Sequence, residues 1–236
     1  MNVYKIQSLP ALLKSNTYPG RGIVLGLTPD GTRSVAAYFI MGRSANSRNR
    51  VFIEEPDGIR TEAFDPSRLE DPSLIIYHPV REVNGTLIVT NGDQTDTIRD
   101  FFLAGKPFVQ ALRTRTFEPD GPNWTPRISG ALSADGSYKL SILKAADPAG
   151  QDCTRHFFEY PPTAGLGHFI HTYLSDGDPI PTFQGEPERV AMDNDLHTFT
   201  DAVWASLNED NKISLFVRYT DLKTGTFRQR ILNKNH

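Results

Sequence analysis

The sequence predicts an α+β fold in which β-strands and helices alternate in blocks along the chain. Three observations support this class. Short apolar runs alternate with turn residues over the first ninety positions, helical patterns follow near the middle, and strand patterns then return before a final helix and hairpin. No internal repeat or linker divides the 236 residues, so a single domain over residues 1–236 is expected.

The first part of the chain is expected to form five strands, at residues 23–27, 35–41, 51–55, 74–83 and 86–90. The first two strands flank Thr28-Pro29-Asp30-Gly31, which is rich in turn residues. The last two are joined by Asn84-Gly85, a pair suited to the positive φ angles of a tight hairpin turn. Because these connections are short, an antiparallel meander is expected.

The rest of the chain mixes helices and hairpins. The expected elements are helices at 96–104 and 108–115, a hairpin of 127–132 with 137–143, a helix capped by Asn194 or Asp195, and a hairpin of 213–219 with 226–232. Residues 161–187 are rich in Gly and Pro and are left unassigned, and within them 168–173 fit either a strand or a short helix.

Composition narrows the class of protein. The formal net charge is -3, and a protein that coats a nucleic acid needs a basic face, so no nucleic-acid partner is expected. Cys153 is the only cysteine, which excludes an internal disulfide and a thiolate-only metal site. No apolar run approaches the roughly 18 residues of a membrane helix, and the first residues lack the pattern of a signal peptide. A cytoplasmic protein without a membrane partner is expected.

Three polar segments could carry chemistry. Gly42 to Arg50 holds three arginines, whose planar forks match phosphate geometry, but it fits a solvated polar loop equally well. Asn91 to Thr97 lies where a strand passes into a helix and fits either an anion site or helix capping, of which capping is favoured. The segment from Glu118 to Arg127 places a carboxylate near an arginine; the carboxylate could transfer protons, although a surface glutamate is commoner.

Other motifs give little support for metal or covalent chemistry. On a strand, His168 and His171 would point to opposite faces, and no matching ligand set surrounds them, so no metal is expected. Cys153 has His156 nearby but no further orienting motif, so it is interpreted as a bystander thiol. Glycine-rich loops that bind dinucleotides or nucleoside triphosphates are absent from the sequence.

Five segments occur in an order that is typical of one family: the loop of residues 42–50, Ile75-Ile76-Tyr77, the motif of residues 91–98, Glu118-Pro119-Asp120 and Thr125-Pro126-Arg127-Ile128. From about Gly20 to Leu143 the chain resembles the archaeal-type IMP cyclohydrolases, a family also found in bacteria. The motifs at 91–98 and 125–128 are the most specific. The chain departs from the family pattern in a longer N-terminal lead-in, extra residues between Ser44 and Arg50, and an insertion after Pro161.

The resemblance implies a four-layer αββα sandwich similar to that of the N-terminal-nucleophile hydrolases. The chain begins Met1-Asn2, so it is expected to lack the N-terminal nucleophile of those enzymes. The resemblance also points to a homo-oligomer and to a reaction that needs no cofactor.

The family closes 5-formamidoimidazole-4-carboxamide ribotide to IMP with loss of water, the last step of purine nucleotide biosynthesis. The resemblance places the catalytic residues of this reaction on Arg50, Tyr77 and Glu118. Arg50 would stabilise an imidate or oxyanion, Tyr77 would hydrogen-bond at the reacting centre, and Glu118 would transfer protons. Binding of the ribotide is expected from Arg43, Asn91 and Arg127.

Two alternatives remain open at this point. A related enzyme of the same fold, such as an amide hydrolase or a cyclohydrolase that acts on a related ribotide, could retain the same three catalytic residues. A purine-nucleotide-binding protein without catalytic activity could retain the same pocket. Turnover of the formylated ribotide distinguishes an IMP cyclohydrolase from these two alternatives.

Overall fold

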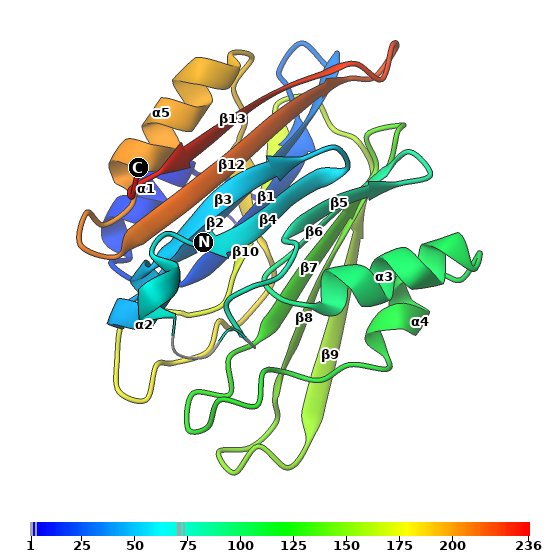
Figure 1. The fold of residues 1–236 in the computed structure, drawn as a ribbon. Coiled ribbons are helices and arrows are strands. Elements are labelled where there is room, and N and C mark those ends of the chain that lie inside the picture. Colours follow the sequence, from blue (N-terminus) through cyan, green and yellow to red (C-terminus); the bar gives the residue numbers. More distant parts are fainter. Residues whose placement is uncertain (1, 3, 70–71, 73) are drawn as a thin grey trace.

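The computed structural model describes residues 2, 4–69, 72 and 74–236, and consists of two antiparallel sheets that face each other between helices (Figure 1). The six-stranded sheet has the order β11-β10-β1-β2-β12-β13, and the seven-stranded sheet runs in chain order from β3 to β9. The six-stranded sheet contains β1 (Arg21–Leu27), β2 (Arg33–Met41), β10 (Leu166–His171), β11 (Glu188–Ala191), β12 (Lys212–Asp221) and β13 (Phe227–Asn233).

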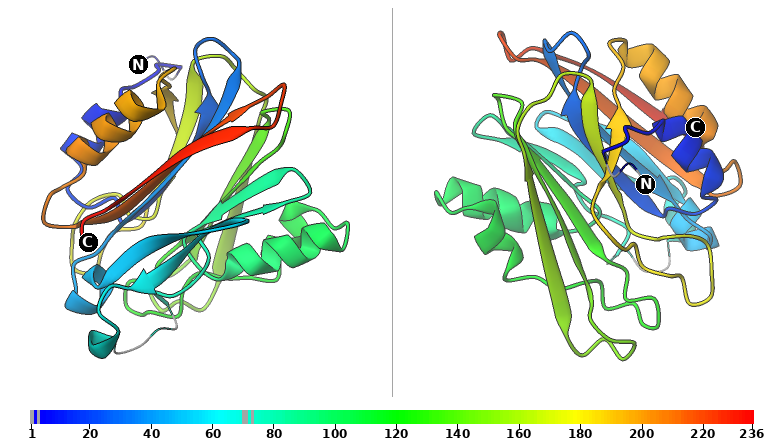
Figure 2. Two further views of the ribbon diagram at one scale, coloured as in Figure 1. Left: turned by 45° about the horizontal axis from the view of Figure 1, so that its top comes forward. Right: turned by 180° about the vertical axis from the view of Figure 1, so that it is seen from behind.

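The seven-stranded sheet contains β3 (Arg50–Glu55), β4 (Gly58–Ala63), β5 (Val80–Val83), β6 (Thr86–Thr90), β7 (Arg127–Leu132), β8 (Tyr138–Ala145) and β9 (Cys153–Tyr160). The helices are α1 (Leu9–Ser15), α2 (Ala45–Arg48), the 3-10 helix η1 (Pro66–Arg68), α3 (Gln94–Leu103), α4 (Phe108–Leu112) and α5 (Leu196–Ser206). Figure 2 shows that α1 and α5 lie against the six-stranded sheet, whereas α3 and α4 lie against the seven-stranded sheet.

Each sheet buries both of its faces, because side chains alternate between the two sides of a strand. In β1, Ile23 and Leu25 pack between the sheets, and Val24 packs on the other side with α1 and α5. A third apolar cluster joins α3 and α4 to the outer face of the seven-stranded sheet. The layers therefore follow the order helices, sheet, sheet, helices, and the layer between the sheets is closed to water along most of its length.

Several expected elements are confirmed. The hairpins β1–β2, β7–β8 and β12–β13 form where the turn residues predict them. Asn84 and Gly85 both have positive φ angles, of 50° and 72°, in the turn between β5 and β6. The Asp195 side chain caps α5 by accepting a hydrogen bond from the Thr198 backbone N–H at 2.7 Å.

Two boundaries were wrong. The expected strand 74–83 is reduced to β5, because the N–H groups of Ile75 and Ile76 bond to the Pro72 carbonyl at 3.1 and 2.9 Å and so form a turn. The expected helix 108–115 ends at Leu112, and Arg115 closes a separate turn on the Leu112 carbonyl at 3.2 Å. Before β5 the apolar residues extend beyond the regular strand, so their pattern does not mark where it begins. After α4 the residues 113–115 are polar, and they form a turn in place of a further helical turn.

Other elements were missed by the sequence patterns. They are α1, α2, η1, β4, β9 and β11, and the open segment 168–173 contributes to β10. Strand β9 is only partly buried and carries several polar residues, so its apolar alternation is weak. In helix α1 the buried Leu9 and Leu13 are four positions apart, which is a helical spacing that is hard to recognise in so short a segment.

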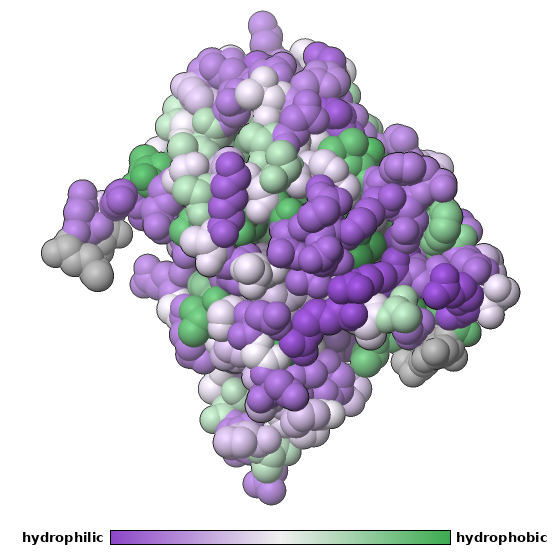
Figure 3. All heavy atoms as spheres, turned by 90° about the vertical axis from the view of Figure 1, so that its left-hand side faces the viewer, coloured by the Kyte–Doolittle hydropathy of each residue, from purple (hydrophilic) through white to green (hydrophobic). Residues whose placement is uncertain are grey.

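The mixed α and β class with two antiparallel sheets is confirmed. The single-domain organisation and the similarity to N-terminal-nucleophile hydrolases stay predictions, and Met1 lies outside the described residues. The face in Figure 3 is mainly hydrophilic, with apolar residues in small scattered groups. Among the described residues, none of the helices has the length and apolar character needed to cross a membrane.

Candidate active site

A cluster of charged and phenolic side chains lies at one end of the layer between the two sheets. Its central members are Arg21, Tyr38, Arg50, Tyr77 and Glu118, and each is at most 8% exposed. They come from five separate segments of the chain, yet the charges of Arg21 and Arg50 both act on the Glu118 carboxyl. The three sequence-predicted catalytic residues are therefore brought together, and two further residues join them.

Strand alternation explains how three of these side chains reach the cluster. Arg21 begins β1 and shares a strand face with Ile23, which packs between the sheets. Arg50 begins β3 and shares a face with Phe52, which belongs to the same apolar layer as Tyr38 of β2. On the strand faces that point between the two sheets, apolar residues are therefore followed by polar residues at this end of the molecule.

Arg50 is fully buried, and its guanidinium is only partly satisfied. Its Nε donates to the Ser47 carbonyl at 2.7 Å, and Nη2 donates to the Ser47 Oγ at 2.8 Å. Its Nη1 has no hydrogen-bond partner among the described residues. Burial lowers the pKa of Arg50, because the charged form has lost its hydration. A buried cationic donor without a partner is suited to receive an oxyanion.

Arg21 supplies a second buried guanidinium, and its Nε also has no hydrogen-bond partner in the described part of the chain. Burial disfavours its charge, but the nearby Glu118 carboxylate and three tyrosines outweigh that effect and raise the pKa of Arg21. The backbone N–H of Arg21 donates to Thr172 Oγ1 at 3.1 Å, which ties the start of β1 to the end of β10. Two cations therefore flank the buried glutamate.

Tyr38 and Tyr77 form a hydroxyl pair, with their oxygens 2.8 Å apart. Burial is the main reason that the pKa of Tyr38 is raised well above its ordinary value, and the neighbouring Tyr77 adds to the effect. The backbone of Tyr77 is fixed by its N–H, which donates to Thr61 Oγ1 at 2.8 Å. Tyr38 is therefore neutral at ordinary pH and keeps a proton to share with Tyr77.

Glu118 is 2% exposed and lies in the connection between α4 and β7. Burial raises the pKa of Glu118 to about 7, against the opposing effect of Arg21, Arg127 and Arg50. Its backbone N–H donates to the Thr125 carbonyl at 2.9 Å, so the turn of residues 118–125 is closed on itself. The interpretation of Glu118 as an exposed turn residue is therefore wrong.

One wall of the cluster is built by hydrogen bonds around Thr125. The Asp120 carboxylate accepts from the Thr125 backbone N–H at 2.6 Å and also bonds to the Thr125 hydroxyl. The same hydroxyl lies 2.6 Å from the Tyr173 hydroxyl. Tyr173 in turn stacks on Tyr18, with ring centroids 5.7 Å apart and an interplanar angle of 16°. The Gly- and Pro-rich segment 161–187 thus contributes Tyr173 to the site.

Arg127 and Asn91 hold the segment that leads into α3. Arg127 Nη1 donates to Gln94 Oε1 at 2.7 Å and lies 2.6 Å from Asp93 Oδ1. Asn91 Oδ1 accepts from the Ile128 backbone N–H at 2.8 Å and from Gln94 Nε2 at 3.0 Å. Both predicted substrate-binding side chains are buried and are engaged with protein groups, Asn91 on both its oxygen and its nitrogen.

Residues 91–97 were also interpreted as a cap for the following helix, but the residue at the N-cap position of α3 does not support this interpretation. Asp93 occupies that position but makes no capping hydrogen bond from its side chain. It forms ion pairs with Arg115 at 2.5 Å and with Arg127 instead, which lower the pKa of its carboxyl against the effect of burial. A side-chain Cβ at Gly92 would lie 2.5 Å from Arg127 Nη1, so only glycine fits there without displacement.

The arginines of residues 42–50 do not converge on one point. Arg43 pairs with Asp176 at 2.7 Å and lies over the Tyr18 ring at 5.3 Å, near the outer edge of the cluster. Arg48 donates to the Gly42 carbonyl at 3.0 Å and to Asn211 Oδ1 at 3.1 Å. Only Arg50 turns inward, because the short helix α2 places Ser47 beneath its guanidinium.

The histidine and cysteine motifs do not join the central members of this cluster, although His171 Nδ1 lies 2.7 Å from the Tyr173 carbonyl oxygen. His168 faces the layer between the sheets and bonds to the Tyr138 hydroxyl at 2.7 Å, whereas His171 lies on the opposite face of β10, as expected. Cys153 and His156 likewise lie on opposite faces of β9. Among the described residues, no group of three or more His, Cys, Asp or Glu has the arrangement of a metal site.

The sequence patterns missed Arg21, Tyr38 and Tyr173 as members of the site. For Arg21 a signal existed, because continuing the alternation of Ile23 and Leu25 by one step turns an arginine into the layer between the sheets. Tyr38 interrupts the apolar strand β2 with a hydroxyl that needs a buried partner. Tyr173 carries no comparable signal, since its segment was left unassigned.

Comparison with known proteins identifies the family. Residues 18–225 match the family described as "IMP cyclohydrolase-like protein". An IMP cyclohydrolase of Halobacterium salinarum is 33% identical over 132 residues, which cover 54% of this chain and 63% of that protein. An IMP cyclohydrolase of Methanopyrus kandleri is 37% identical over 123 residues, covering 50% and 59%. One from Methanococcus aeolicus is 30% identical over 163 residues, covering 66% and 74%.

The chain spans 63% of the Halobacterium protein and 59% of the Methanopyrus protein. The family match, by contrast, reaches from before β1 into the turn after β12, and it includes every member of the buried cluster. The chain therefore belongs to the IMP cyclohydrolase-like protein family.

Proposed function

We propose that this protein is an IMP cyclohydrolase, which closes 5-formamidoimidazole-4-carboxamide ribotide to IMP with loss of water in purine nucleotide biosynthesis. Family membership supports the reaction, and the meeting of Arg50, Tyr77 and Glu118 in one buried cluster supports the site. The single observation that carries the proposal is a buried Glu118 with a pKa of about 7 between two arginines.

The chemistry defines what the site must supply. Both reacting groups belong to one molecule, so proximity comes from the substrate once its formamide is held in the correct rotamer. The carboxamide nitrogen is a weak nucleophile and must lose a proton as it attacks the formyl carbon. The formyl oxygen then becomes negatively charged and departs as water with two protons, one from the carboxamide nitrogen and one from the formamide nitrogen, which forms a double bond to the former formyl carbon.

Glu118 is the proposed proton carrier. With a pKa of about 7, its carboxyl is present in both protonation states near neutral pH. It can therefore accept the proton of the carboxamide nitrogen and then donate a proton to the departing oxygen. Both transfers require a carboxyl whose pKa lies near 7. An exposed glutamate has a lower pKa and does not meet this requirement.

The two buried arginines are the proposed anion stabilisers. Arg50 Nη1 and Arg21 Nε have no hydrogen-bond partner among the residues that the structure describes, so each can bond to a substrate oxygen without breaking a contact seen there. Burial strengthens the attraction between such donors and a developing charge, because little water screens it. The hydroxyl pair of Tyr38 and Tyr77 supplies a further neutral donor beside them.

The substrate-binding roles of Arg43, Asn91 and Arg127 stay predictions. The three residues differ in position, and this difference suggests a different role for each. Arg127 carries a charge that acts on Glu118, so it belongs near the reacting centre. Asn91 is fully engaged with the segments around Ile128 and Pro126 and so holds the wall in place. Arg43 is partly exposed near Tyr18, where it could meet the polar end of a ribotide.

The proposal also covers the fold relationship, the location, the cofactor requirement and the oligomeric state of the protein. The layers of helices and sheets support a relationship to the N-terminal-nucleophile hydrolase fold. The reaction as proposed takes place in the cytoplasm, needs no cofactor and is carried out by a homo-oligomer. The family supports the cofactor-free reaction and the homo-oligomer, whereas the cytoplasmic location is also expected from the composition of the chain.

The decisive experiment is to supply the formylated ribotide and to follow ultraviolet absorbance while chromatography identifies the product. We expect IMP from the wild-type protein and a much lower rate from Glu118→Gln, with Cys153→Ser as the matched control. Formation of formate and the deformylated ribotide would identify an amide hydrolase. Tight binding of IMP with no turnover would identify a nucleotide-binding protein and would contradict the proposal.

A further inference from the structure

Helix α2 carries the residue that holds the Arg50 guanidinium in place. Nε and Nη2 form one edge of this planar group, and both donate to Ser47, to its carbonyl at 2.7 Å and to its Oγ at 2.8 Å. Because the group is planar, fixing that edge also fixes the direction of Nη1 on its other side. This nitrogen is buried and has no hydrogen-bond partner among the described residues. Ser47 therefore decides the direction of this donor.

The position of Ser47 is itself restricted. The Ser44 side chain accepts a hydrogen bond from the Ser47 backbone N–H at 3.1 Å, which fixes the start of α2. On another side, a Cβ at Gly42 would lie 2.5 Å from the Ser47 Oγ, so only a glycine leaves room for the hydroxyl there. The Ser47 hydroxyl is therefore confined between the Gly42 backbone and the Arg50 guanidinium.

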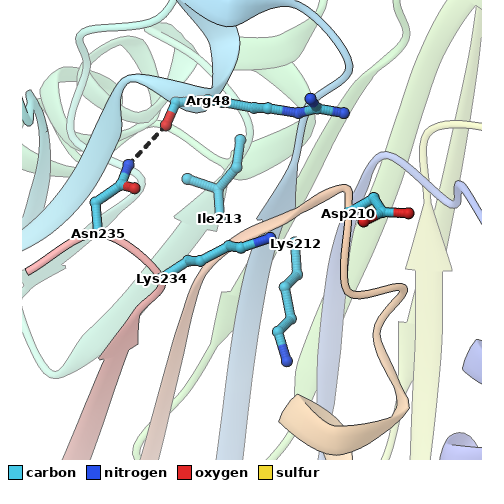
Figure 4. A pocket seen from close by; sticks show the side chains of 6 residues that line it. All are labelled: Arg48, Asp210, Lys212, Ile213, Lys234 and Asn235. Atoms are coloured by element: carbon cyan, nitrogen blue, oxygen red, sulfur yellow. Dashed lines mark hydrogen bonds between the residues drawn. The ribbon is translucent and has the colours of Figure 1, made fainter.

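Contacts from a distant segment hold the two elements that form this contact. Asn235 Nδ2 donates to the Arg48 carbonyl of α2 at 2.8 Å, as Figure 4 shows. Asn233 bonds to both the backbone N–H and the carbonyl of Phe52, at 2.8 and 3.1 Å, and so holds the strand that Arg50 begins. A helix of four residues is too short to be stable alone, so these contacts keep α2 and β3 together.

We propose that Ser47 is a positioning residue, whose hydroxyl aims Arg50 Nη1 at the oxygen that becomes negatively charged during ring closure. This inference rests on the proposed function and adds a residue that acts through Arg50. The charge of Arg50 acts on the Glu118 carboxyl, so the guanidinium lies beside the proposed proton carrier. A donor stabilises a developing charge only when it is held in the correct direction, and the Ser47 contact supplies that direction.

The family resemblance does not supply this role. Ser47 lies between Ser44 and Arg50, where the sequence departs from the family pattern. Asn233 and Asn235 lie beyond residues 18–225, which match the family. The positioning of a catalytic arginine by α2 is therefore inferred from the contacts of this chain.

The test is Ser47→Ala, which removes the hydroxyl and leaves the backbone carbonyl in place. We expect kcat for the formylated ribotide to fall by about 10- to 100-fold, the effect of one hydrogen bond to a charged group. KM should stay within about twofold of the wild type, because the lost interaction acts in the transition state. Ser67→Ala is the matched control and should leave kcat unchanged, since it removes the hydroxyl of an exposed serine on the short helix η1.

A double-mutant cycle separates positioning from a general structural effect. Arg50→Lys has no planar edge for Ser47 to hold, so adding Ser47→Ala to it should lower kcat by less than about twofold further. Wild-type kcat in Ser47→Ala would overturn the proposal. An equal loss from Ser47→Ala in the wild-type and Arg50→Lys backgrounds would also overturn it, because the two residues would then act independently.

A second measurement needs no turnover. In NMR spectra of the isotope-labelled full chain, rotation of the Arg50 guanidinium about its Nε–Cζ bond should be slow in the wild type and in Ser67→Ala. In Ser47→Ala it should be faster by about tenfold or more, since the bond to Nη2 is lost. Arg50→Lys identifies the signals by removing them.

Equal rotation rates in the wild type and Ser47→Ala would overturn the proposal. A wild-type protein that does not convert the ribotide would contradict the proposed function. In that case the rotation rates alone would decide whether Ser47 holds Arg50 in position.

Discussion

Replacing Glu118 by Gln keeps the shape of the side chain and removes its titration. In the wild-type protein the carboxyl has an ordinary pKa of 4.5 when the chain is unfolded, and burial raises it to about 7 in the folded state. Between these two pH values the folded protein holds a proton that the unfolded chain has released. The free energy of unfolding of the wild type must therefore fall as the pH rises through this window.

The size of the effect follows from the same two values. At about 1.4 kcal/mol for each pH unit, the difference corresponds to about 3 kcal/mol of stability lost between pH 4.5 and 7. Glu118→Gln carries no titrating group, so its stability should not show this loss. The variant should match the wild type near pH 4 and exceed it by about 3 kcal/mol at pH 8. Over the same range its turnover should be lower by about 10² to 10⁴, because proton transfer is lost.

Urea unfolding at pH 4, 6 and 8 measures the stability difference, and turnover of the formylated ribotide over the same range measures the rate. A variant that is more stable but slower than the wild type would indicate that the buried carboxyl of Glu118 lowers stability and is needed for turnover. A variant with wild-type turnover and an unchanged pH profile would remove Glu118 from proton transfer. Parallel stability curves for the two proteins would show that the pKa of Glu118 is not raised.

Three further predictions concern two residues of the site and one outside it. Arg50→Lys keeps the charge but loses the planar fork, so the barrier to turnover should rise by about 2–4 kcal/mol, and a rate within about twofold of wild type would exclude Arg50 from the reacting centre. Gly92→Ala would place a methyl group 2.5 Å from Arg127 Nη1, so urea unfolding should show a loss of about 1–3 kcal/mol, and unchanged stability would show that this wall can adjust. Cys153→Ser should keep near-normal turnover, because the thiol packs with α3 and α4, and a large loss in a folded variant would point to a covalent mechanism.

Local patterns in the sequence predicted the hairpins well, because a turn such as Asn84-Gly85 is defined by the conformational freedom of its own residues. They failed where distant groups decide the conformation. The segment before β5 reads as a strand, but its backbone is turned by bonds to Pro72 and Thr61. Strand β9 is specified by pairing with β8 over its whole length, and its own composition is too polar to indicate a strand.

The order of motifs along the chain determined the family and pointed to Arg50, Tyr77 and Glu118 as a set. Motif order could not show that Arg21 and Tyr38 join them, or that Tyr173 arrives from a segment that was left unassigned. Nor could it tell that Arg43 and Arg48 lie away from Arg50, although all three occur within eight residues of one another.

The sequence by itself determined the mixed α and β class and most of the strands, since these depend on local periodicity and on turn residues. It also predicted Arg50, Tyr77 and Glu118 as catalytic residues, through the resemblance of its motifs to a family. Only the tertiary structure decided the environment of those side chains. Glu118 gains a raised pKa because the packing of two sheets removes it from water. Arg50 Nη1 has no partner in the described part of the chain, because Ser47 of α2 engages Nε and Nη2 instead. Desolvation and hydrogen-bond partners are properties of the assembled layers, and no single segment of the chain contains them.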